Sequence, residues 1–344
     1  MINYPTMWDR ATITTVSSLA AFGSMFAVRR FAPRLGLVDV PNERSSHAEA
    51  TPCAGGIAIL IGIAAGLLLL GPPGAREVAA GAAIGAVALV SLADDRGGLS
   101  VASRLVAQVL AASVVVTSLD LPVVDLGIPG LPTPLPRIVG LWLSGLFLVA
   151  YANFFNFMDG INGLASGQAA ISAAALALLM GGGGSSGVAW AVCGASLGSL
   201  PHNFPRAKIF MGDVGAVTLG LLLATLSQWA HTRDGIPWST ILLIHAVFLA
   251  DSVATILLRL TRGENVTRPH REHHFQLLVR AGWSHAETTV AFWTMSAACG
   301  IAALQSVGVG VERRWASLLI PTAALGLGSL LVRRRRKAPV EARA

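Results

Sequence analysis

Long apolar runs fill almost the whole chain and constrain its fold more than any other feature. A helix that crosses a bilayer needs about 20 mostly apolar residues. Only 12% of the residues are charged and the mean hydropathy is +0.64, whereas a soluble domain carries about 25% charged residues. We therefore expect an all-α integral membrane protein, with residues 1–344 forming a single polytopic domain of about eleven transmembrane helices. The expected spans lie near residues 11–30, 54–71, 76–93, 102–119, 137–154, 164–181, 186–203, 212–231, 237–259, 286–308 and 315–332.

Positive charge is unevenly distributed over the gaps between these runs. Eleven spans place alternate gaps on opposite sides of the membrane, and one side then holds 19 of the 25 Lys and Arg residues, including the basic tail 333–344. Cytoplasmic loops carry an excess of Lys and Arg. We therefore predict that this side is cytoplasmic, that the N-terminus lies outside and that the C-terminus lies in the cytoplasm. The tail should contact anionic lipid, and we expect no nucleic-acid partner.

Two clusters of oxygen-bearing side chains end apolar runs on the predicted cytoplasmic side. Asp94 and Asp95 are candidates for a general base or a cation site, with a solvated helix end as the simpler alternative. Asn153, Asn156 and Asp159 are three residues apart, so a helix would place them on one face. Their oxygens suit a hard cation, Mg²⁺ or Mn²⁺, although the same pattern is typical of a capped helix end.

A third cluster on the same side combines Asp213 with the basic residues Arg206 and Lys208 and with Asn203. Asp213 opens an apolar run, where a carboxylate either caps a helix or binds a metal while its basic neighbours bind phosphate oxygens. Further along, Asp251 lies near an apolar run. It is a candidate functional residue, or it pairs with an arginine of another helix.

A fourth cluster gathers three histidines, His270, His273 and His274, around Arg271. Their spacing would place them on one helical face. Histidines can ligate a soft metal, but the other clusters offer oxygen ligands and no cysteine is near, so diphosphate binding is favoured. Together the clusters indicate phosphoryl transfer at the membrane surface. A proton-coupled transporter or flippase would place its ionisable residues mid-span, and a lipid-diphosphate phosphatase would need no nucleotide.

The ordered motifs resemble the polyprenyl-phosphate N-acetylhexosamine-1-phosphate transferases, which include phospho-MurNAc-pentapeptide translocase and the enzymes that initiate O-antigen synthesis. The matching segments, between about residues 30 and 280, are Asp94-Asp95 with Arg104 and Gln108, Asn153-Phe-Phe-Asn156-Phe-Met-Asp159-Gly160, Asn203-Phe-Pro-Arg-Ala-Lys208-Ile-Phe-Met-Gly-Asp213, and His270–His274. Pro41–His47 is similar to the O-antigen subgroup, although Cys53 stands where that subgroup usually has arginine. Asn162 likewise replaces a common aspartate.

The resemblance implies a bacterial inner-membrane enzyme with cytoplasmic active-site loops. It would move a HexNAc-1-phosphate from a UDP-N-acetylhexosamine to undecaprenyl phosphate and release UMP, either by direct attack, which we favour, or through a covalent aspartyl intermediate. A homodimer is compatible with it, and membrane lipids surround it. The implied metal ligands are Asn156 and Asp213, and the implied catalytic residues are Asp94, Asp95 and Asp159. The implied substrate-binding residues are Arg44, His47, Arg104, Asn153, Asn203, Lys208, His270, Arg271, His273 and His274.

Overall fold

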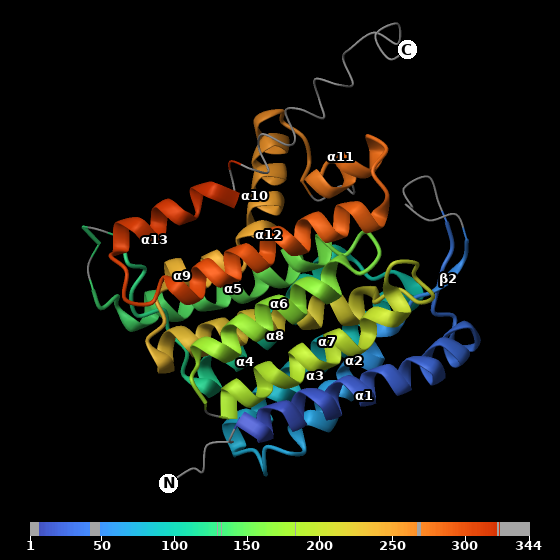
Figure 1. Cartoon of the computed structure of the whole chain (residues 1–344), viewed down its shortest axis with the longest axis horizontal. Helices are drawn as coiled ribbons and strands as arrows, with labels where there is room; N and C mark the ends of the chain where they lie inside the picture. The colour runs from blue at the N-terminus through green and yellow to red at the C-terminus, as the bar shows by residue number, and fades with distance from the viewer. Residues whose placement is uncertain are drawn as a thin grey trace, which may run out of the picture.

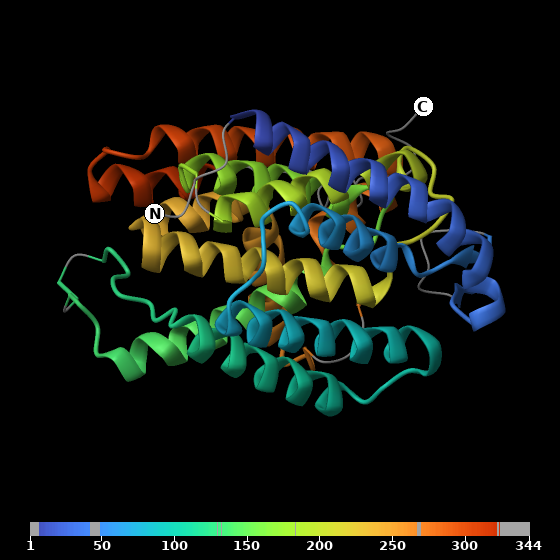
Figure 2. The same cartoon turned by 90° about the horizontal axis from the view of Figure 1, so that it is seen from below.

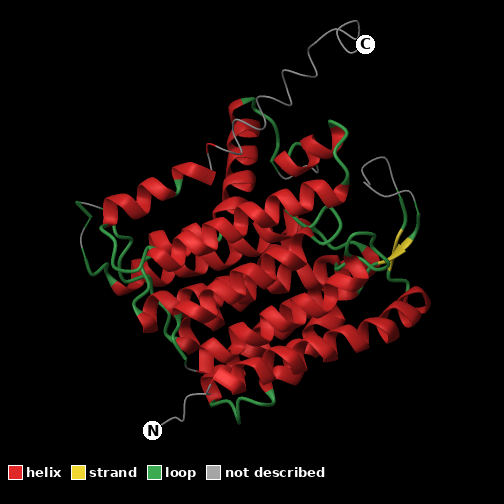
Figure 3. Cartoon of the chain, in the orientation of Figure 1, coloured by secondary structure: helices red, strands yellow, loops and turns green. Residues whose placement is uncertain are grey.

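The fold is a bundle of helices, most of which run along the long axis of the molecule (Figures 1 and 3). The computed structural model describes residues 7–41, 49–128, 130–131, 133–182, 184–266, 270–321 and 323. Its helices are α1 (Met7–Phe31), a 3₁₀ turn η1 (Ala32–Leu35), α2 (Gly55–Leu67), α3 (Ala75–Gly97), α4 (Val101–Leu119), α5 (Arg137–Phe157), α6 (Leu164–Leu179), α7 (Gly184–Asn203), α8 (Gly212–Asp234), α9 (Trp238–Ile244), α10 (Ala246–Thr261), α11 (His274–Arg280), α12 (His285–Gln305) and α13 (Val311–Ser317).

Helix α8 is the central element of the bundle (Figure 2). It packs against α2, α3, α5, α6 and α7, and 89% of its most apolar stretch is buried, compared with 22% to 33% in the other long apolar helices. Small residues permit this close packing. A Cβ atom on Gly220, for example, would lie 2.8 Å from the Cα atom of Ala152 on α5. The first turn of α8 is therefore held from several sides.

The prediction of an all-α membrane protein is confirmed, but the count of about eleven spans is not. Among the described residues, five helices are long and apolar enough to cross a membrane, namely α1, α3, α4, α5 and α8, and the pair α9 and α10 would make a sixth if it is one span. The runs at 54–71 and 164–181 form helices of only 13 and 16 residues.

The other differences from the expected spans have separate physical reasons. Helices α7 and α12 have 20 and 21 residues, but their Ser, Thr, His and Gly residues dilute the apolar surface that a lipid-facing span needs. The run at 237–259 is broken by a bend of 84° between α9 and α10, so α10 stands across the bundle in Figure 1. Most of the run at 315–332 and the tail at 333–344 lie outside the described residues.

A short two-stranded sheet covers one end of the bundle. Strand β1 (Val38–Asp39) pairs antiparallel with β2 (Thr51–Pro52), with Val38 opposite Pro52 and Asp39 opposite Thr51. The chain then enters α2 beside the segment that leads into α8, because the backbone N–H groups of Gly55 and Gly56 donate to the carbonyls of Phe210 and Met211, both at 2.8 Å. This sheet and the starts of α2 and α8 form one wall of the candidate site.

Candidate active site

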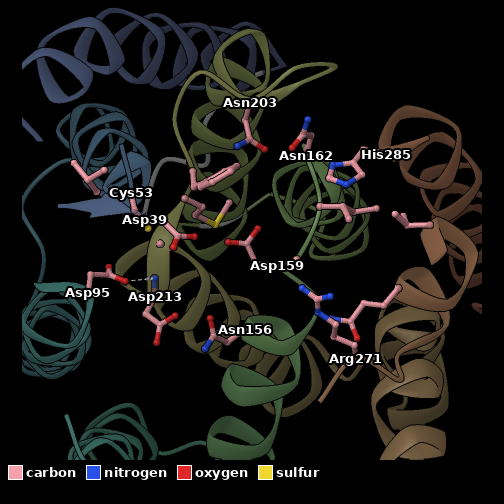
Figure 4. A pocket seen from close by; sticks show the side chains of 18 of the residues that line it. Asp39, Cys53, Asp95, Asn156, Asp159, Asn162, Asn203, Asp213, Arg271 and His285 are labelled. Atoms are coloured by element: carbon pink, nitrogen blue, oxygen red, sulfur yellow. Dashed lines mark hydrogen bonds between the residues drawn. The ribbon is translucent and has the colours of Figure 1, made fainter. Parts of the chain in front are cut away.

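A cavity of about 740 Å³ opens at the end of the bundle where four of the sequence clusters meet. Its walls come from segments far apart in the sequence, and Figure 4 shows Asp159 between Asp39 and Asp213 on one side and Arg271 and His285 on the other. The lining residues are Val38, Asp39, Cys53, Asp95, Asn156, Asp159, Gly160, Ile161, Asn162, Asn203, Phe210, Met211, Gly212, Asp213, Arg271, Gln276, Val279, Arg280 and His285. Carboxylates thus face basic side chains across one space.

Asp95 caps the central helix from another helix. The backbone N–H of Asp213 donates to Oδ1 of Asp95 at 2.9 Å, and that of Val214 donates to Oδ2 at 3.0 Å. The first N–H groups of a helix have no partner within the helix, and a carboxylate there is also favoured by the helix dipole. Both Asp95 oxygens are therefore used to fix the start of α8, which places the Asp213 side chain.

Arg104 joins two of the predicted carboxylates. Its Nη1 lies 2.7 Å from Oδ2 of Asp94 and 3.3 Å from Oδ2 of Asp213. The other oxygen of Asp94 accepts the backbone N–H of Leu99, at the turn between α3 and α4. Asp94 thus orients Arg104, and Arg104 supplies a partly exposed positive charge beside Asp213.

At Gly212 in this wall, both the backbone conformation and the neighbouring atoms exclude a side chain. Its φ is +73°, a conformation that residues with a Cβ atom rarely adopt. A Cβ atom would lie 2.8 Å from Oδ2 of Asp95 and 3.1 Å from Sγ of Cys53. The missing side chain lets Asp95 reach the start of α8. Burial, with the nearby Asp95 charge, raises the pKa of the Cys53 thiol well above its usual range, so this thiol stays protonated.

Asn156 and Asp159 reach the cavity from the end of α5. The helix ends at Phe157, and the backbone N–H of Asp159 donates to the carbonyl of Asn156 at 3.1 Å. Desolvation, followed by the charges of Asp213 and Asp95, raises the pKa of Asp159 to about 7. Asp159 is therefore partly protonated near neutral pH in the free protein.

Three of the predicted polar residues have mainly structural contacts. Asn203 lines the cavity, but its Oδ1 accepts the N–H of Gly163 and its Nδ2 donates to the carbonyl of Ile209 at 2.7 Å. Asn153 lies outside the cavity lining and donates to Oε1 of Gln108 on α4 at 2.6 Å. Lys208 is exposed and also lies outside the lining.

The histidine cluster is built around Asp251, so that residue pairs with histidines and not with an arginine, which was one of the two alternatives left open for it. Nδ1 of His273 and Nδ1 of His274 lie 3.0 and 3.1 Å from Oδ1 of Asp251, and the backbone N–H of His274 donates to the same oxygen at 3.0 Å. All three side chains are buried. Neither His273, the N-cap of α11, nor His274, its first residue, lines the cavity.

His270 also lies outside the cavity lining, whereas Arg271 is part of it. Desolvation, followed by the charges of His273 and Arg259, lowers the pKa of His270 to about 4, so His270 is neutral at pH 7 in the free protein. The loop is held by an ion-pair network in which Arg262 lies 2.8 Å from Glu272, and buried Arg259 lies 3.1 Å from Glu264. This network fixes the segment that presents Arg271.

The structure adds cavity residues that the sequence did not single out. Gln276, Val279 and Arg280 come from one face of α11, and His285 is the first residue of α12. Ser284 and Glu287 form a capping box at this helix start. The Ser-x-x-Glu pattern was readable in the sequence, and could have placed His285 at a helix start. The predicted substrate-binding residues Arg44 and His47 lie outside the described residues.

The oxygen donors of the cavity fit a magnesium ion whose ligands come partly from the protein and partly from a substrate. Among the described residues, no group of three or more His, Cys, Asp or Glu side chains is placed to hold a metal unaided. The available donors are instead the Asp213 carboxylate and the Asn156 amide, both hard oxygen ligands in a cavity with room for phosphates. Mg²⁺ is usually bound in this way, through one or two carboxylates together with substrate phosphates and water.

Comparisons with known proteins agree with these motifs. Residues 78–231 match the family model described as glycosyl transferase family 4. The chain is 35% identical to the decaprenyl-phosphate N-acetylglucosaminephosphotransferase of Mycolicibacterium smegmatis, over 79% of this chain and 77% of that protein. It is 31% identical to the undecaprenyl-phosphate alpha-N-acetylglucosaminyl 1-phosphate transferase of Escherichia coli K12, over 84% and 80%.

A third relative is the probable undecaprenyl-phosphate N-acetylglucosaminyl 1-phosphate transferase of Bacillus subtilis, which is 29% identical over 85% of this chain and 83% of that protein. The matches extend over most of each sequence, and the family model covers the cavity segments around Asp95, Asn156 and Asp213. The chain therefore belongs to glycosyl transferase family 4, among the polyprenyl-phosphate N-acetylhexosamine-1-phosphate transferases.

Proposed function

We propose that this protein transfers an N-acetylhexosamine-1-phosphate from a UDP-sugar to a polyprenyl phosphate, releasing UMP and forming the lipid diphosphosugar that begins a cell-surface polysaccharide. The observation that carries the proposal is the single cavity in which Asp213, Asn156 and Asp159 face Arg271 and Arg280. Oxygen donors and guanidinium groups around one space are what a diphosphate and its cation need. The relatives' names favour N-acetylglucosamine-1-phosphate as the group transferred.

Roles for the cavity residues follow from their contacts. Asp213 and Asn156 would hold Mg²⁺, which when bound would neutralise negative charge on the donor diphosphate. Arg104, held by Asp94 at 2.7 Å, is placed to bind a phosphate oxygen beside Asp213. Arg271 and Arg280 would bind the donor from the opposite wall.

Direct attack by the lipid phosphate is favoured over a covalent aspartyl intermediate. Both oxygens of Asp95 accept backbone N–H groups of α8, and both oxygens of Asp94 are bonded to Arg104 and Leu99. A nucleophilic carboxylate would have to give up these bonds. Positioned phosphates, charge neutralisation and fixed guanidinium groups are sufficient for phosphoryl transfer.

An apolar groove between α4 and α5 is suited to the acceptor's isoprenoid chain. It measures about 770 Å³, is lined by residues from Val109 to Thr117 and from Ile138 to Val149, and includes the exposed Trp142. At one end, Val109 and Val149 adjoin the hydrogen bond between Asn153 and Gln108. Asn153 would then lie between the apolar groove and the polar cavity. We place the cavity on the cytoplasmic side of a bacterial inner membrane, where UDP-sugars are made.

The proposal is tested by UMP release from purified protein in detergent. The reaction contains undecaprenyl or decaprenyl phosphate, Mg²⁺ and a panel of UDP-N-acetylhexosamines, and UMP is quantified by chromatography. We expect UMP only when lipid, cation and a suitable donor are all present. Release of inorganic phosphate from a lipid diphosphate without nucleotide would instead identify a phosphatase, and folded protein that binds no UDP-sugar would contradict the transferase function.

The pH dependence of the Mg²⁺ requirement should reflect the titration of Asp159. Its raised pKa, about 7, means that it gains a proton as the pH falls through 7, and the cavity then loses a negative charge that attracts Mg²⁺. Because metal binding and protonation compete, the Mg²⁺ concentration for half-maximal UMP release should rise by up to about tenfold between pH 7 and pH 6. The Asp159→Asn variant should show a smaller rise but not lose it, because burial also raises the pKa of Asp213 to about 7 and that of Asp95 to about 6. An unchanged rise in that variant would assign the titration to another group.

A further inference from the structure

The sharp bend between α9 and α10 lacks the usual local cause. Sharp helix kinks almost always occur at proline, at glycine or serine pairs, at π-bulges or where a side chain enters the backbone ladder. The two helices meet at 84°, yet the sequence from Trp238 to Thr261 contains no proline and no glycine. The residue at the break is His245, which ends α9 and precedes α10, with φ −100° and ψ 4°. The cause of the bend must therefore be sought in its tertiary contacts.

The His245 side chain joins two neighbouring helices at this break. Its Nδ1 lies 2.6 Å from the hydroxyl of Tyr151 on α5, and its Nε2 lies 2.8 Å from Oγ of Ser227 on α8. All three residues are completely buried. A buried imidazole with both nitrogens bonded is held much more firmly than one that packs as an apolar ring, because an unpaired nitrogen there would cost about 1–3 kcal/mol.

The available protons fix how this network is connected. Ser227 donates its one hydroxyl proton to the carbonyl of Leu223 at 2.8 Å, so in its contact with His245 it must accept. His245 therefore carries its proton on Nε2, which leaves Nδ1 to accept the proton of Tyr151. Each donor has an acceptor, and the arrangement requires a neutral imidazole. The three side chains form a directional cross-link from α5 through the break to α8.

A second set of buried hydrogen bonds joins α6 and α12. Nε2 of Gln168 donates to Oγ of Ser172, one turn further along α6, at 2.8 Å. Ser296 on α12 donates in turn to Oε1 of Gln168. Both sets of buried polar contacts lie in an otherwise apolar bundle, where such contacts are specific in geometry.

The direction of α10 determines where part of the cavity wall lies. Asp251 is six residues after His245 on α10, and it binds His273, His274 and the first backbone N–H groups of α11. Helix α11 in turn contributes Gln276, Val279 and Arg280 to the cavity. A rotation of α10 about the break would move Asp251 and, with it, the basic wall.

We propose that His245 is a positioning residue: bonded to Tyr151 and Ser227, it fixes the angle of α10 and so places α11 and its Arg280 against the cavity. This inference rests on the proposed function only for its kinetic consequence. The structural consequence is that α11 loses its fixed position when the cross-link is removed, whatever reaction the protein performs.

The test compares variants by hydrogen–deuterium exchange of the full-length protein in detergent. In His245→Ala, and less strongly in Tyr151→Phe, amides of residues 270–280 should exchange at least about tenfold faster while those of α1 to α4 do not change. Tyr151→Phe removes one hydroxyl and keeps the ring, so it serves if His245→Ala does not fold. The matched control is Thr240→Val, which removes the buried Thr240–Ser306 hydrogen bond (2.8 Å) of α9 without touching the break.

The kinetic arm measures the KM for the UDP-sugar. We expect it to rise by about tenfold in Tyr151→Phe with a smaller fall in kcat, because the basic wall binds donor. His245→Asn, which retains an acceptor for Tyr151, should recover part of the loss relative to His245→Ala. Unchanged exchange at 270–280, or an equal increase in Thr240→Val, would overturn the proposal. If wild-type protein released no UMP, the proposed function would fail and the exchange result would still decide the role of His245.

Discussion

Asp213→Asn should lower UMP release by about 1,000-fold, a loss typical of removing one strong contact to a charged reacting group. The amide keeps the shape of the side chain but removes the negative charge that would hold the cation, and it weakens the contact with Arg104 at 3.3 Å. The backbone N–H of Asp213 would still donate to Asp95. The start of α8 should therefore remain in place, so the loss should be chemical and not structural.

The thermal stability of the variant distinguishes a chemical loss of activity from a loss caused by misfolding. The cavity already holds the carboxylates of Asp39, Asp95 and Asp159 near Asp213, so removing one charge should leave the thermal unfolding temperature without Mg²⁺ unchanged or slightly higher. Asp234→Asn is the matched control, because Asp234 is the last residue of the same helix and should keep near wild-type activity. A variant at Asp213 that retained more than about a tenth of the activity would remove this residue from the cation site.

Most helices could be placed from the sequence because apolar runs are a local property. The runs at 102–119, 137–154 and 212–231 correspond closely to α4, α5 and α8. Whether a run crosses a membrane as one straight helix is not local. The run at 237–259 contains no glycine and no internal proline, yet it bends because His245 bonds to Tyr151 and Ser227, which are distant in sequence. The span count was too high mainly because the runs at 54–71 and 164–181 form helices of only 13 and 16 residues and because polar residues dilute the apolar surface of α7 and α12.

In the candidate site, too, local features could be predicted from the sequence and contacts between distant residues could not. The motifs around Asp94, Asn156 and Asp213 could be recognised from residue types and spacing, and the structure brings their segments to one end of the bundle. Their individual contacts could not be predicted in this way. Asp95 caps a helix that begins more than a hundred residues later, and Asp251 binds two histidines that the sequence suggested as phosphate ligands. Such partners depend on which helices pack together.

Gly56→Ala should be the most destabilising small substitution near the site. A Cβ atom at Gly56 would lie 2.2 Å from the backbone N and 2.3 Å from the Cα atom of Gly215 on α8. Backbone atoms cannot rotate away as a flexible side chain can, so α2 and α8 must separate. Overpacking of this kind costs about 3 kcal/mol, which corresponds to a fall of roughly 10 °C in the unfolding temperature.

The same displacement should reduce activity, because the two helices share the start of the site. The N–H of Gly56 donates to the carbonyl of Met211 at 2.8 Å, next to the Asp95 cap, so moving α2 shifts Asp213 away from Asn156. Gly81→Ala on α3 is the control, because a Cβ atom there meets nothing within 4 Å. It should be neutral or stabilise its helix by up to about 1 kcal/mol. Unfolding followed by tryptophan fluorescence in detergent distinguishes the two. Equal melting temperatures for both variants would show that the close contact of α2 with α8 does not hold the first turn of α8 in place.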